Sequence, residues 1–465
     1  MPTAKMPEDF SQRIHLALRS WHNQKPDDAL ENLLSTQQIG IEQDRATVRL
    51  ISNQVLLNGI QRLQQSNEEA ADILRSRFLN QETAQAVGFR RNVSEDIIFQ
   101  RQRTAIEELA EVIWGQEQAL LKQRKGRIEA RLEFPTYTKL FGITEKLAEV
   151  RALVELETEP GVVALEGMGG LGKTSLADAL ARQLASSTRF DEVGWVSARR
   201  RLFHLSGNMH ALEKRPDLTL AELLDSLIEQ FDLDGLVHAS DTEKLLGVKE
   251  FLKSRPCMIV VDNLETAADY STLVLQLTGL TYPSKFLITT RYSLRDVSGV
   301  YIMTLKQLGY DDAITLIRHE AKTRGLSELA DAPVSELEPI YTATGGNPLA
   351  IKLVVGQIHS LSLSVVLSRF SAVQGKPVEE LLNFLYSAAW ETLDANHRRV
   401  LQAMLLVAEE GHLEQISAAT ELPEDLTAAC LHHLTGLSLV SVSGNMHEKR
   451  YSLHQLTQAF VARQS

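Results

Sequence analysis

The sequence predicts a multidomain protein with an α-helical N-terminal domain, an α/β domain built on a parallel sheet, a small helical domain and a C-terminal winged helix. Two observations carry most of this prediction. Over residues 10–131, apolar positions recur three or four apart among frequent Gln, Glu, Arg and Ala, which is typical of helices. Over residues 161–304, short apolar runs alternate with helical stretches, which is typical of a parallel sheet covered by helices. We place the four domains at residues 1–133, 134–305, 306–375 and 376–465.

Composition narrows the class of protein. The chain has 465 residues, 44% of them apolar, which is enough for a core in each domain. No apolar run approaches the eighteen or so residues of a membrane span, and the first residues lack a signal peptide's apolar region, so we expect a cytoplasmic protein without membrane partners. The net charge of −12 argues against a protein whose whole surface binds nucleic acid. Residues 1–140, however, carry equal numbers of acidic and basic side chains. Cys257 and Cys430 are too few for a disulfide framework or a zinc cluster.

The individual elements follow in chain order. After the helical N-terminal part, Pro135 and Gly142 mark a loop, and a helix capped by Thr144 is expected over 144–156. The strand candidates are 162–167, 192–197, 257–262, 286–290 and 300–304, and the clearest helices between them are 220–231 and 242–252. Residues 310–371 read as helix again. From Pro377 a last helix-rich unit is expected, which ends in a hairpin and a final helix, the pattern of a winged helix.

One glycine-rich motif carries the strongest functional signal. The apolar run that starts at Val162 leads into GMGGLGKT and then into an Ala- and Leu-rich helix. Glycines let successive backbone N–H groups curl round an anion, Lys173 reaches the outer phosphates, and the Thr174 hydroxyl is a ligand for Mg²⁺. The alternative, a plain glycine-rich turn, does not explain the flanking strand and helix. We therefore predict a P-loop that binds ATP or ADP through Met168, Gly169, Gly170, Leu171, Gly172, Lys173, Thr174 and Ser175.

Two further strands end in candidate partners of this loop. The strand CMIVVD ends at Asp262, which we expect beside the Mg²⁺ bound at Thr174, although an acid after a strand is also a common turn former. Asn263 stands where a second acid would orient the attacking water, and Glu265 follows it, so we expect slow hydrolysis. The strand KFLITTR ends at Arg291, which is placed to sense a γ-phosphate unless it is a plain surface arginine. The predicted catalytic residues are Lys173, Asp262 and Arg291.

Taken in order, these motifs resemble the STAND class of P-loop NTPases, specifically the bacterial NB-ARC type, from about Thr136 to the C-terminus. GMGGLGKTSLA is similar to the P-loop of that family nearly letter for letter, and VVDNLE departs from its double-aspartate form only at Asn263. LFGITEKL resembles the segment whose backbone holds adenine, which implies contacts from Phe141, Gly142 and Ile143, where Ile143 replaces the usual arginine.

Two C-terminal motifs complete the resemblance. GGNPLAIKL is similar to the motif whose proline packs on the base, which implies that Pro348 contacts adenine. SLHQLTQAF resembles the winged-helix motif whose histidine touches the ADP β-phosphate, here His454, with Gln455 in place of the usual aspartate. Taken singly, the first is a helix N-terminus with an early proline and the second a lone histidine, so only the complete set favours the functional interpretation.

The resemblance implies a switch. ADP would be clamped in a closed form, and exchange for ATP would release the winged helix and drive self-assembly, with Arg291 and His454 distinguishing the two nucleotides. The expected output is transcription regulation or antiviral and defence signalling. Family members usually carry a repeat sensor after the winged helix, so we expect a separate sensor or effector protein or a sensor missing from this chain. The competing interpretations are a continuously cycling ATPase, against which Asn263 counts, and a scaffold that holds ADP as a structural cofactor.

Residues 67–113 leave two alternatives for the output. A helix over 68–79, a short helix over 82–88, a basic turn over 89–92 and a third helix capped by Ser94 have helix-turn-helix spacing. The third helix resembles the recognition helix of sigma-factor region four, which implies DNA phosphate contacts from Arg90, Arg91, Arg101 and Arg103. The alternative is a protein-interaction bundle in which Ile97, Ile98, Ile106, Leu109 and Ile113 pack inward. The basic stretch 121–133 is expected to be a linker helix, and no caspase, nuclease or TIR-like signature is visible in this part of the chain.

Overall fold

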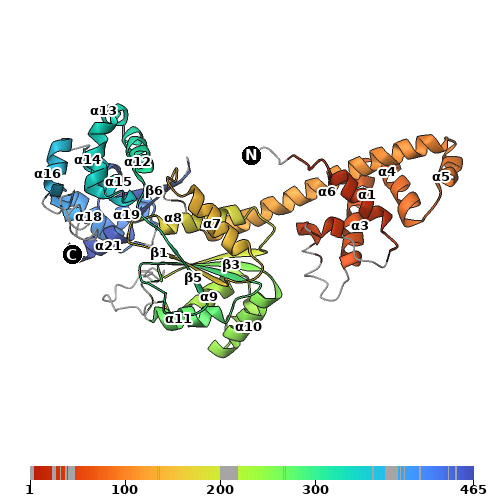
Figure 1. The fold of residues 1–465 in the computed structure, drawn as a ribbon, viewed down its shortest axis with the longest axis horizontal. Coiled ribbons are helices and arrows are strands. Elements are labelled where there is room, and N and C mark those ends of the chain that lie inside the picture. Colours follow the sequence, from red (N-terminus) through yellow and green to blue (C-terminus); the bar gives the residue numbers. More distant parts are fainter. Residues whose placement is uncertain are drawn as a thin grey trace. The chain divides into compact units, whose positions relative to one another are not determined.

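The computed structural model describes the chain outside residues 1–4, 24–27, 32, 37–38, 40–47, 133–134, 136, 199–217, 265–266, 268, 359–360, 372–385, 388, 392, 408–409, 438, 446–447 and 465. Thr136, Glu265 and Pro377, which the sequence analysis singled out, therefore lie outside the described residues. The chain divides into two compact units, one made of residues 1–130 and 185–188, the other of residues 131–184 and 189–465. Figure 1 shows their elements.

The N-terminal unit is helical throughout its described residues. Its helices are α1 (Phe10–Arg19), α3 (Val48–Ser66), α4 (Glu68–Leu74), α5 (Ala84–Arg91) and α6 (Glu95–Arg131), with short turns η1 (Asp28–Leu30) and η2 (Arg75–Leu79). Helices α3 and α6 approach each other closely, because a Cβ on Gly59 would lie 2.8 Å from the side chain of Ile113. Leu56, Ile60 and Leu109 are fully buried and belong to the same core.

The candidate helix-turn-helix differs from the prediction in three ways. The helix predicted over 68–79 changes to π-helical geometry in η2. The short helix starts at Ala84, where Thr83 caps it, and includes most of the predicted basic turn, so that only Asn92 leaves the helix, in a left-handed conformation with φ of 55°. Helix α6 runs for 37 residues without a break, so the predicted linker helix is its last part.

A five-stranded parallel sheet forms the centre of the larger unit. Its strands are β1 (Val162–Glu166), β2 (Glu192–Ser197), β3 (Cys257–Asp262), β4 (Lys285–Thr290) and β5 (Val300–Thr304), in the order β2-β3-β4-β1-β5. The five predicted strands are thus confirmed to within one residue at each end. Because β4 pairs with both β1 and β3, the three strands that carry the predicted nucleotide motifs end side by side.

Helices cover both faces of this sheet (Figure 1). Helices α9 (Leu220–Gln230), α10 (Asp241–Ser254) and α11 (Tyr270–Thr278) bury one face, on which Ile259 and Ile288 are fully buried. Helices α7 (Thr144–Glu155) and α8 (Lys173–Leu184) lie on the other. Helix α7 begins where predicted, but the cap prediction was wrong: Ile143 is the N-cap residue, and it provides no side-chain hydrogen bond.

The outer strand β2 is bonded by a side chain along its edge. Gln230 at the end of α9 accepts a hydrogen bond from the Trp195 N–H at 2.9 Å and donates one to the Trp195 carbonyl at 2.9 Å. It also donates to the Ser226 hydroxyl at 2.9 Å, which fixes the amide. Gln230 therefore bonds to β2 as a neighbouring strand's peptide group would.

The rest of the larger unit is mainly helical. It consists of α12 (Tyr310–Thr323), α13 (Ser327–Asp331), α14 (Val334–Thr344), α15 (Pro348–Ile358), α16 (Leu363–Ser371), α18 (Ala395–Met404), α19 (Leu413–Thr420), α20 (Glu424–Gly436), the hairpin strands β6 (Val440–Gly444) and β7 (Lys449–Leu453), and α21 (Gln455–Gln464). The predicted hairpin and final helix are present, and β6 pairs antiparallel with β7. None of the helices described is both long and apolar enough to span a membrane.

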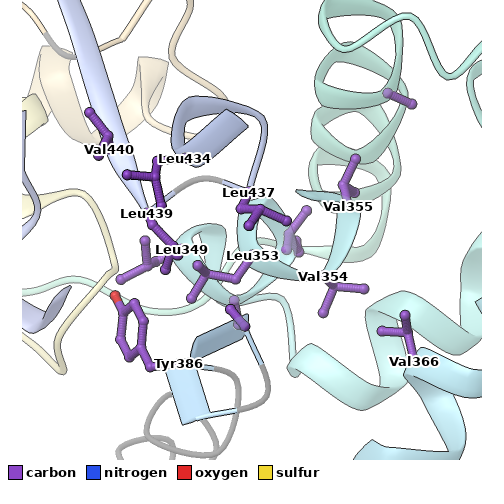
Figure 2. Close-up of a cluster of buried hydrophobic side chains, with 14 of the residues drawn as sticks. Leu349, Leu353, Val354, Val355, Val366, Tyr386, Leu434, Leu437, Leu439 and Val440 are labelled. Carbon is purple, nitrogen blue, oxygen red and sulfur yellow. The ribbon is translucent and has the colours of Figure 1, made fainter. Parts of the chain in front are cut away.

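One hydrophobic core joins the α12–α16 helices to the C-terminal elements. Figure 2 shows Leu349 and Leu353 of α15 facing Leu434, Leu437 and Leu439. The approach is close, because a Cβ on Gly356 would lie 2.9 Å from the Leu437 backbone. Arg324 at the end of α12 donates to the Thr435 and Gly436 carbonyls at the end of α20. Helix α15 is therefore packed against the C-terminal elements by apolar contacts along its length.

Candidate nucleotide-binding site

The predicted P-loop connects β1 to α8, which begins at Lys173. Gly170 and Gly172 have φ values of 80° and 87°, in the left-handed region that glycine adopts without strain. At Gly170 space is a second constraint, since a Cβ would lie 2.8 Å from the Leu349 Cβ and 2.9 Å from the Asn347 Oδ1. The glycine pattern therefore reflects close contact with α15 as well as the curvature of the loop.

Four successive carbonyl groups of this loop accept hydrogen bonds. The buried Lys173 Nζ donates to the Gly167 carbonyl at 2.7 Å and to the Met168 carbonyl at 2.9 Å. The Asn347 Nδ2 donates to the Gly169 carbonyl at 3.0 Å, and the Leu349 N–H donates to the Gly170 carbonyl at 3.3 Å. The carbonyls of residues 167–170 are thus held by Lys173 at the start of α8 and by Asn347 and Leu349 at the start of α15.

The predicted metal ligands Thr174 and Asp262 lie together. Asp262 is fully buried at the end of β3, and its Oδ1 accepts hydrogen bonds from Thr174 Oγ1 at 2.8 Å and Thr289 Oγ1 at 2.6 Å. The Thr289 hydroxyl in turn accepts the Asn263 N–H at 2.9 Å, and Asn263 itself has a left-handed φ of 59°. Helix α8 and strand β4 therefore each provide one donor to the carboxylate at the end of β3.

This donor set fits magnesium. Mg²⁺ in nucleotide sites uses one or two protein oxygens and takes the others from phosphate and water. Asp262 and Thr174 provide one carboxylate and one hydroxyl oxygen, and the described residues contain no cluster of three or more His, Cys, Asp or Glu that could hold another kind of metal. A magnesium ion bound here would offset the charge of the phosphates, and Thr289 would keep the Asp262 carboxylate in place.

The two segments predicted to contact adenine approach each other through Leu308. Gly142 has a φ of 63°, and a Cβ on it would lie 2.7 Å from the Leu308 Cδ2. The Leu308 N–H donates to the Gly346 carbonyl at 3.0 Å, two residues before Pro348, the first residue of α15. The Phe141 ring lies 5.2 Å from the ring of His319. Leu308 thus lies beside both Gly142, in the middle of residues 141–143, and Gly346, shortly before Pro348.

A partly buried hydrogen bond anchors the segment that leads into residues 141–143. The Tyr137 hydroxyl donates to Asp178 Oδ2 at 2.6 Å, and Arg182 Nε donates to the same oxygen at 2.8 Å. Burial raises the pKa of Tyr137, and the hydrogen bond to Asp178 raises it further. Asp178 and Arg182 belong to α8, the helix that begins with Lys173 of the P-loop. This contact therefore connects the predicted adenine segment to the P-loop helix.

The predicted phosphate sensor Arg291 follows β4, and the other, His454, precedes α21, against which Tyr386 packs. Burial raises the pKa of Tyr386 to about 12, and the Thr457 hydrogen bond and the charge of Arg291 act in the opposite direction. Thr457 Oγ1 donates to the Tyr386 hydroxyl at 3.2 Å, and the Tyr386 ring stacks on Phe460 with 5.5 Å between centroids. His454 directly precedes α21, so Tyr386 contacts the helix that follows this residue.

The sequence analysis missed Asn347, Thr289 and Tyr386. Asn347 had a recognisable signal, since an Asn before a Pro at a helix start is a typical N-cap. Thr289 had none, because its contact with Asp262 depends on the position of β4 beside β3. Tyr386 follows a segment outside the described residues and belongs to no motif.

Three of the four arginines predicted to contact DNA, all except Arg103, make ion pairs among the described residues of the structure. Arg90 pairs with Glu82 at 2.9 Å, Arg91 with Asp72 at 2.5 Å, and both Arg91 and Arg101 with Glu69. Of the isoleucines and leucine predicted to face inward in the alternative bundle, Ile98, Ile106, Leu109 and Ile113 are buried. Ile97 was predicted wrongly, since 38% of it is exposed, because its neighbour Ile98 occupies the inward side of α6.

Comparison with known proteins agrees with the central motifs. Residues 144–326 match the family model of the NB-ARC domain. A search of curated protein sequences gives no significant match. These residues are therefore similar to a nucleotide-binding domain of the P-loop NTPases, while the parts of the chain before and after them are outside the match.

Solved structures give weaker similarities. A STAND protein with a tetratricopeptide repeat sensor from Pyrococcus horikoshii aligns at 19% identity over 71% of this chain, with a TM-score of 0.47. The chain spans 44% of the length of that protein. A Drosophila ORC structure bound to DNA aligns at 15% identity over 69% of this chain and 92% of its own, with a TM-score of 0.34. A Thermotoga maritima RuvB variant aligns at 13% identity over 71% of this chain and 99% of its own, with a TM-score of 0.28.

Proposed function

We propose that the chain is a nucleotide-dependent signalling switch of the NB-ARC and STAND type, closed with ADP and self-assembling with ATP. The observation that carries the proposal is the bonding of the P-loop to α15. Asn347 and Leu349 hold the Gly169 and Gly170 carbonyls, and the other side of α15 packs against the C-terminal elements. A change in the bound phosphates can therefore act through α15 on the C-terminal elements, which the proposed switch would move.

The C-terminal elements support a specific closed form. The order α18, α19, α20, β6, β7 and α21, together with the pairing of Gly411 with Tyr451, supports the proposal of a winged helix, and α12–α16 would be the ARC-type helical domain. In this proposal His454 contacts the β-phosphate of ADP and Arg291 reads the γ-phosphate of ATP. Thr457 of α21, three residues after His454, donates a hydrogen bond to the Tyr386 hydroxyl.

Slow hydrolysis fits the same arrangement. Asp262 is bonded by Thr174 and Thr289 and is suited to orienting a metal. Asn263 has an amide where an acid would assist the attacking water. We therefore assign Lys173, Asp262 and Arg291 to binding and slow turnover of ATP, which suits a switch better than an ATPase that cycles continuously.

The N-terminal unit is the proposed output. DNA phosphates bind to positive charges that acids of the protein do not already neutralise. Arg90, Arg91 and Arg101 are paired with acids of the same unit, so a protein-interaction bundle is favoured over DNA binding. Phe89, with 87% of its surface exposed, and Phe99, with 46%, add apolar surface to the same region. The effector would be a separate protein that contacts this unit.

The experiment that tests the function is size-exclusion chromatography with light scattering on the full chain. The protein is stripped of nucleotide and measured in ADP and in ATP with Mg²⁺. A monomer in ADP that becomes a discrete oligomer in ATP supports the switch. An unchanged mass together with rapid ATP turnover would instead identify a continuously cycling ATPase, and an unchanged mass with tightly retained ADP would identify a scaffold.

A further inference from the structure

The hydrogen bonds from the start of α15 to the P-loop carbonyls also fix the orientation of the N–H groups in the same peptide planes. A trans peptide is planar, so the N–H of each residue points opposite to the carbonyl of the residue before it. A donor that fixes the Gly169 carbonyl therefore also fixes the Gly170 N–H, and a donor on the Gly170 carbonyl fixes the Leu171 N–H. In a P-loop these N–H groups are the ones that face the phosphates.

Asn347 is suited to this task by having both a donor and an acceptor. Its Oδ1 accepts the N–H groups of Leu349 and Ala350 at 3.0 and 3.1 Å, which caps α15. The Leu349 N–H is shared between this oxygen and the Gly170 carbonyl at 3.3 Å. Its Nδ2 donates to the Gly169 carbonyl. The residue is fully buried, so its amide cannot exchange these partners for bulk water. An aspartate of the same shape would cap the helix equally well but would lack the donor toward the loop.

We infer that Asn347 is a positioning residue that, with the Leu349 N–H, aligns two P-loop peptides for phosphate binding and so makes nucleotide affinity depend on the docking of α15. The inference rests on the proposed nucleotide binding and adds the group that couples it to the helical segment. Coupling of this kind is reciprocal: a nucleoside diphosphate bound at the loop holds α15 in place, and displacement of α15 weakens the hold on the nucleotide.

The packing of α15 extends the coupling to the C-terminal elements. Leu349 contacts the P-loop with its backbone, while its side chain belongs to the core shared with Leu434 and Leu439 (Figure 2). Polarisation along the bonded peptides strengthens their N–H groups as donors. A partner that pulls the C-terminal elements from α15 would therefore promote nucleotide release without touching the phosphates.

The test compares Asn347→Asp with Thr344→Val in the full chain, using a fluorescent ADP analogue for affinity. Thr344 is also buried, and its hydroxyl bonds to the Ile340 carbonyl within the same segment and not to the P-loop, so it is a matched control. We expect ADP affinity to fall about tenfold or more in Asn347→Asp and to change less than about twofold in Thr344→Val. Wild-type affinity in Asn347→Asp would overturn the inference.

Hydrogen exchange measures the coupling itself. In the wild type and in Thr344→Val, saturating ADP should slow exchange in both the P-loop and α15, whereas in Asn347→Asp the effect on α15 should be lost. Should Asn347→Asp fail to fold, Asn347→Ser retains a cap but is too short to reach Gly169, and the same loss is expected. Unchanged protection of α15 in either variant would refute the coupling. Absence of ADP binding by the wild type would instead refute the proposed function, on which the inference depends.

Discussion

Thr289→Val removes one hydroxyl that serves both as donor to Asp262 and as acceptor for Asn263. Thr289 is buried, with 1% of its surface exposed, and valine has nearly the same shape, so the substitution creates no cavity. It deletes a hydrogen bond of 2.6 Å to a charged carboxylate and one of 2.9 Å from the Asn263 N–H. Such losses together reduce the free energy of unfolding by about 2 to 4 kcal/mol.

The assay has two parts. Urea unfolding followed by tryptophan fluorescence measures the free energy, with Trp195 of β2, 6% exposed, as a reporter within the sheet. Titration of Mg²⁺ in the presence of a fluorescent ADP analogue measures the metal site. Because Thr289 orients the proposed metal ligand, the apparent Mg²⁺ affinity should fall about tenfold.

Thr290→Val is the matched control. Thr290 is the next residue of β4 and is fully buried, but its hydroxyl bonds to the backbone of Tyr292 and not to Asp262. It should lose about 1 kcal/mol of stability and bind Mg²⁺ as the wild type does. Superimposable Mg²⁺ titrations for wild type and Thr289→Val would show that Asp262 is not oriented by Thr289 for a metal.

Three other predictions follow. Lys173→Ala should abolish nucleotide retention by removing the cation at the outer phosphates, measured by chromatography of the nucleotide released from the purified protein; an unchanged ADP content would contradict the P-loop assignment. His454→Ala should weaken ADP binding more than ATP binding and promote assembly, measured by affinity and mass in each nucleotide; equal weakening of both would remove its role at the β-phosphate. Tyr386, whose pKa burial raises from 10.0 to about 12, binds a proton more strongly in the native state, so the free energy of unfolding should fall as the pH rises from 10 to 12. In Tyr386→Phe, the free energy of unfolding, measured with urea at several pH values, should fall less steeply with pH than in the wild type, by about 1.4 kcal/mol per pH unit. Equal slopes for the two proteins would argue against the raised pKa of Tyr386.

Local patterns in the sequence predicted most of the fold, because each strand and glycine turn has its own signature. Buried parallel strands read as apolar runs, and these located β1 to β5 to within a residue. Helix ends were less well predicted: Thr144 was expected to cap α7, but its side chain does not do so. Residues 89–92 were expected to form a basic turn, yet α5 continues to Arg91 and the chain turns at Asn92.

The site was predictable only where its residues belong to one motif. The P-loop and Asp262 were found because each lies at the end of an apolar run. The contact of Asp262 with Thr289 depends on β4 lying beside β3, and strand order is not encoded in any short segment. The ion pairs of Arg91 and Arg101 with Glu69 were equally hidden, because they join residues 22 and 32 positions apart.

The edge of the sheet at β2 limits how copies of this protein can assemble. An outer strand with unpaired peptide groups can bind a strand from another molecule and extend the sheet from chain to chain. Gln230 satisfies both peptide groups of Trp195 at the middle of that strand, so an incoming strand would first have to displace its amide. Extension of the sheet through the middle of β2 is therefore disfavoured, and we expect the proposed assembly in ATP to use other surfaces than this edge.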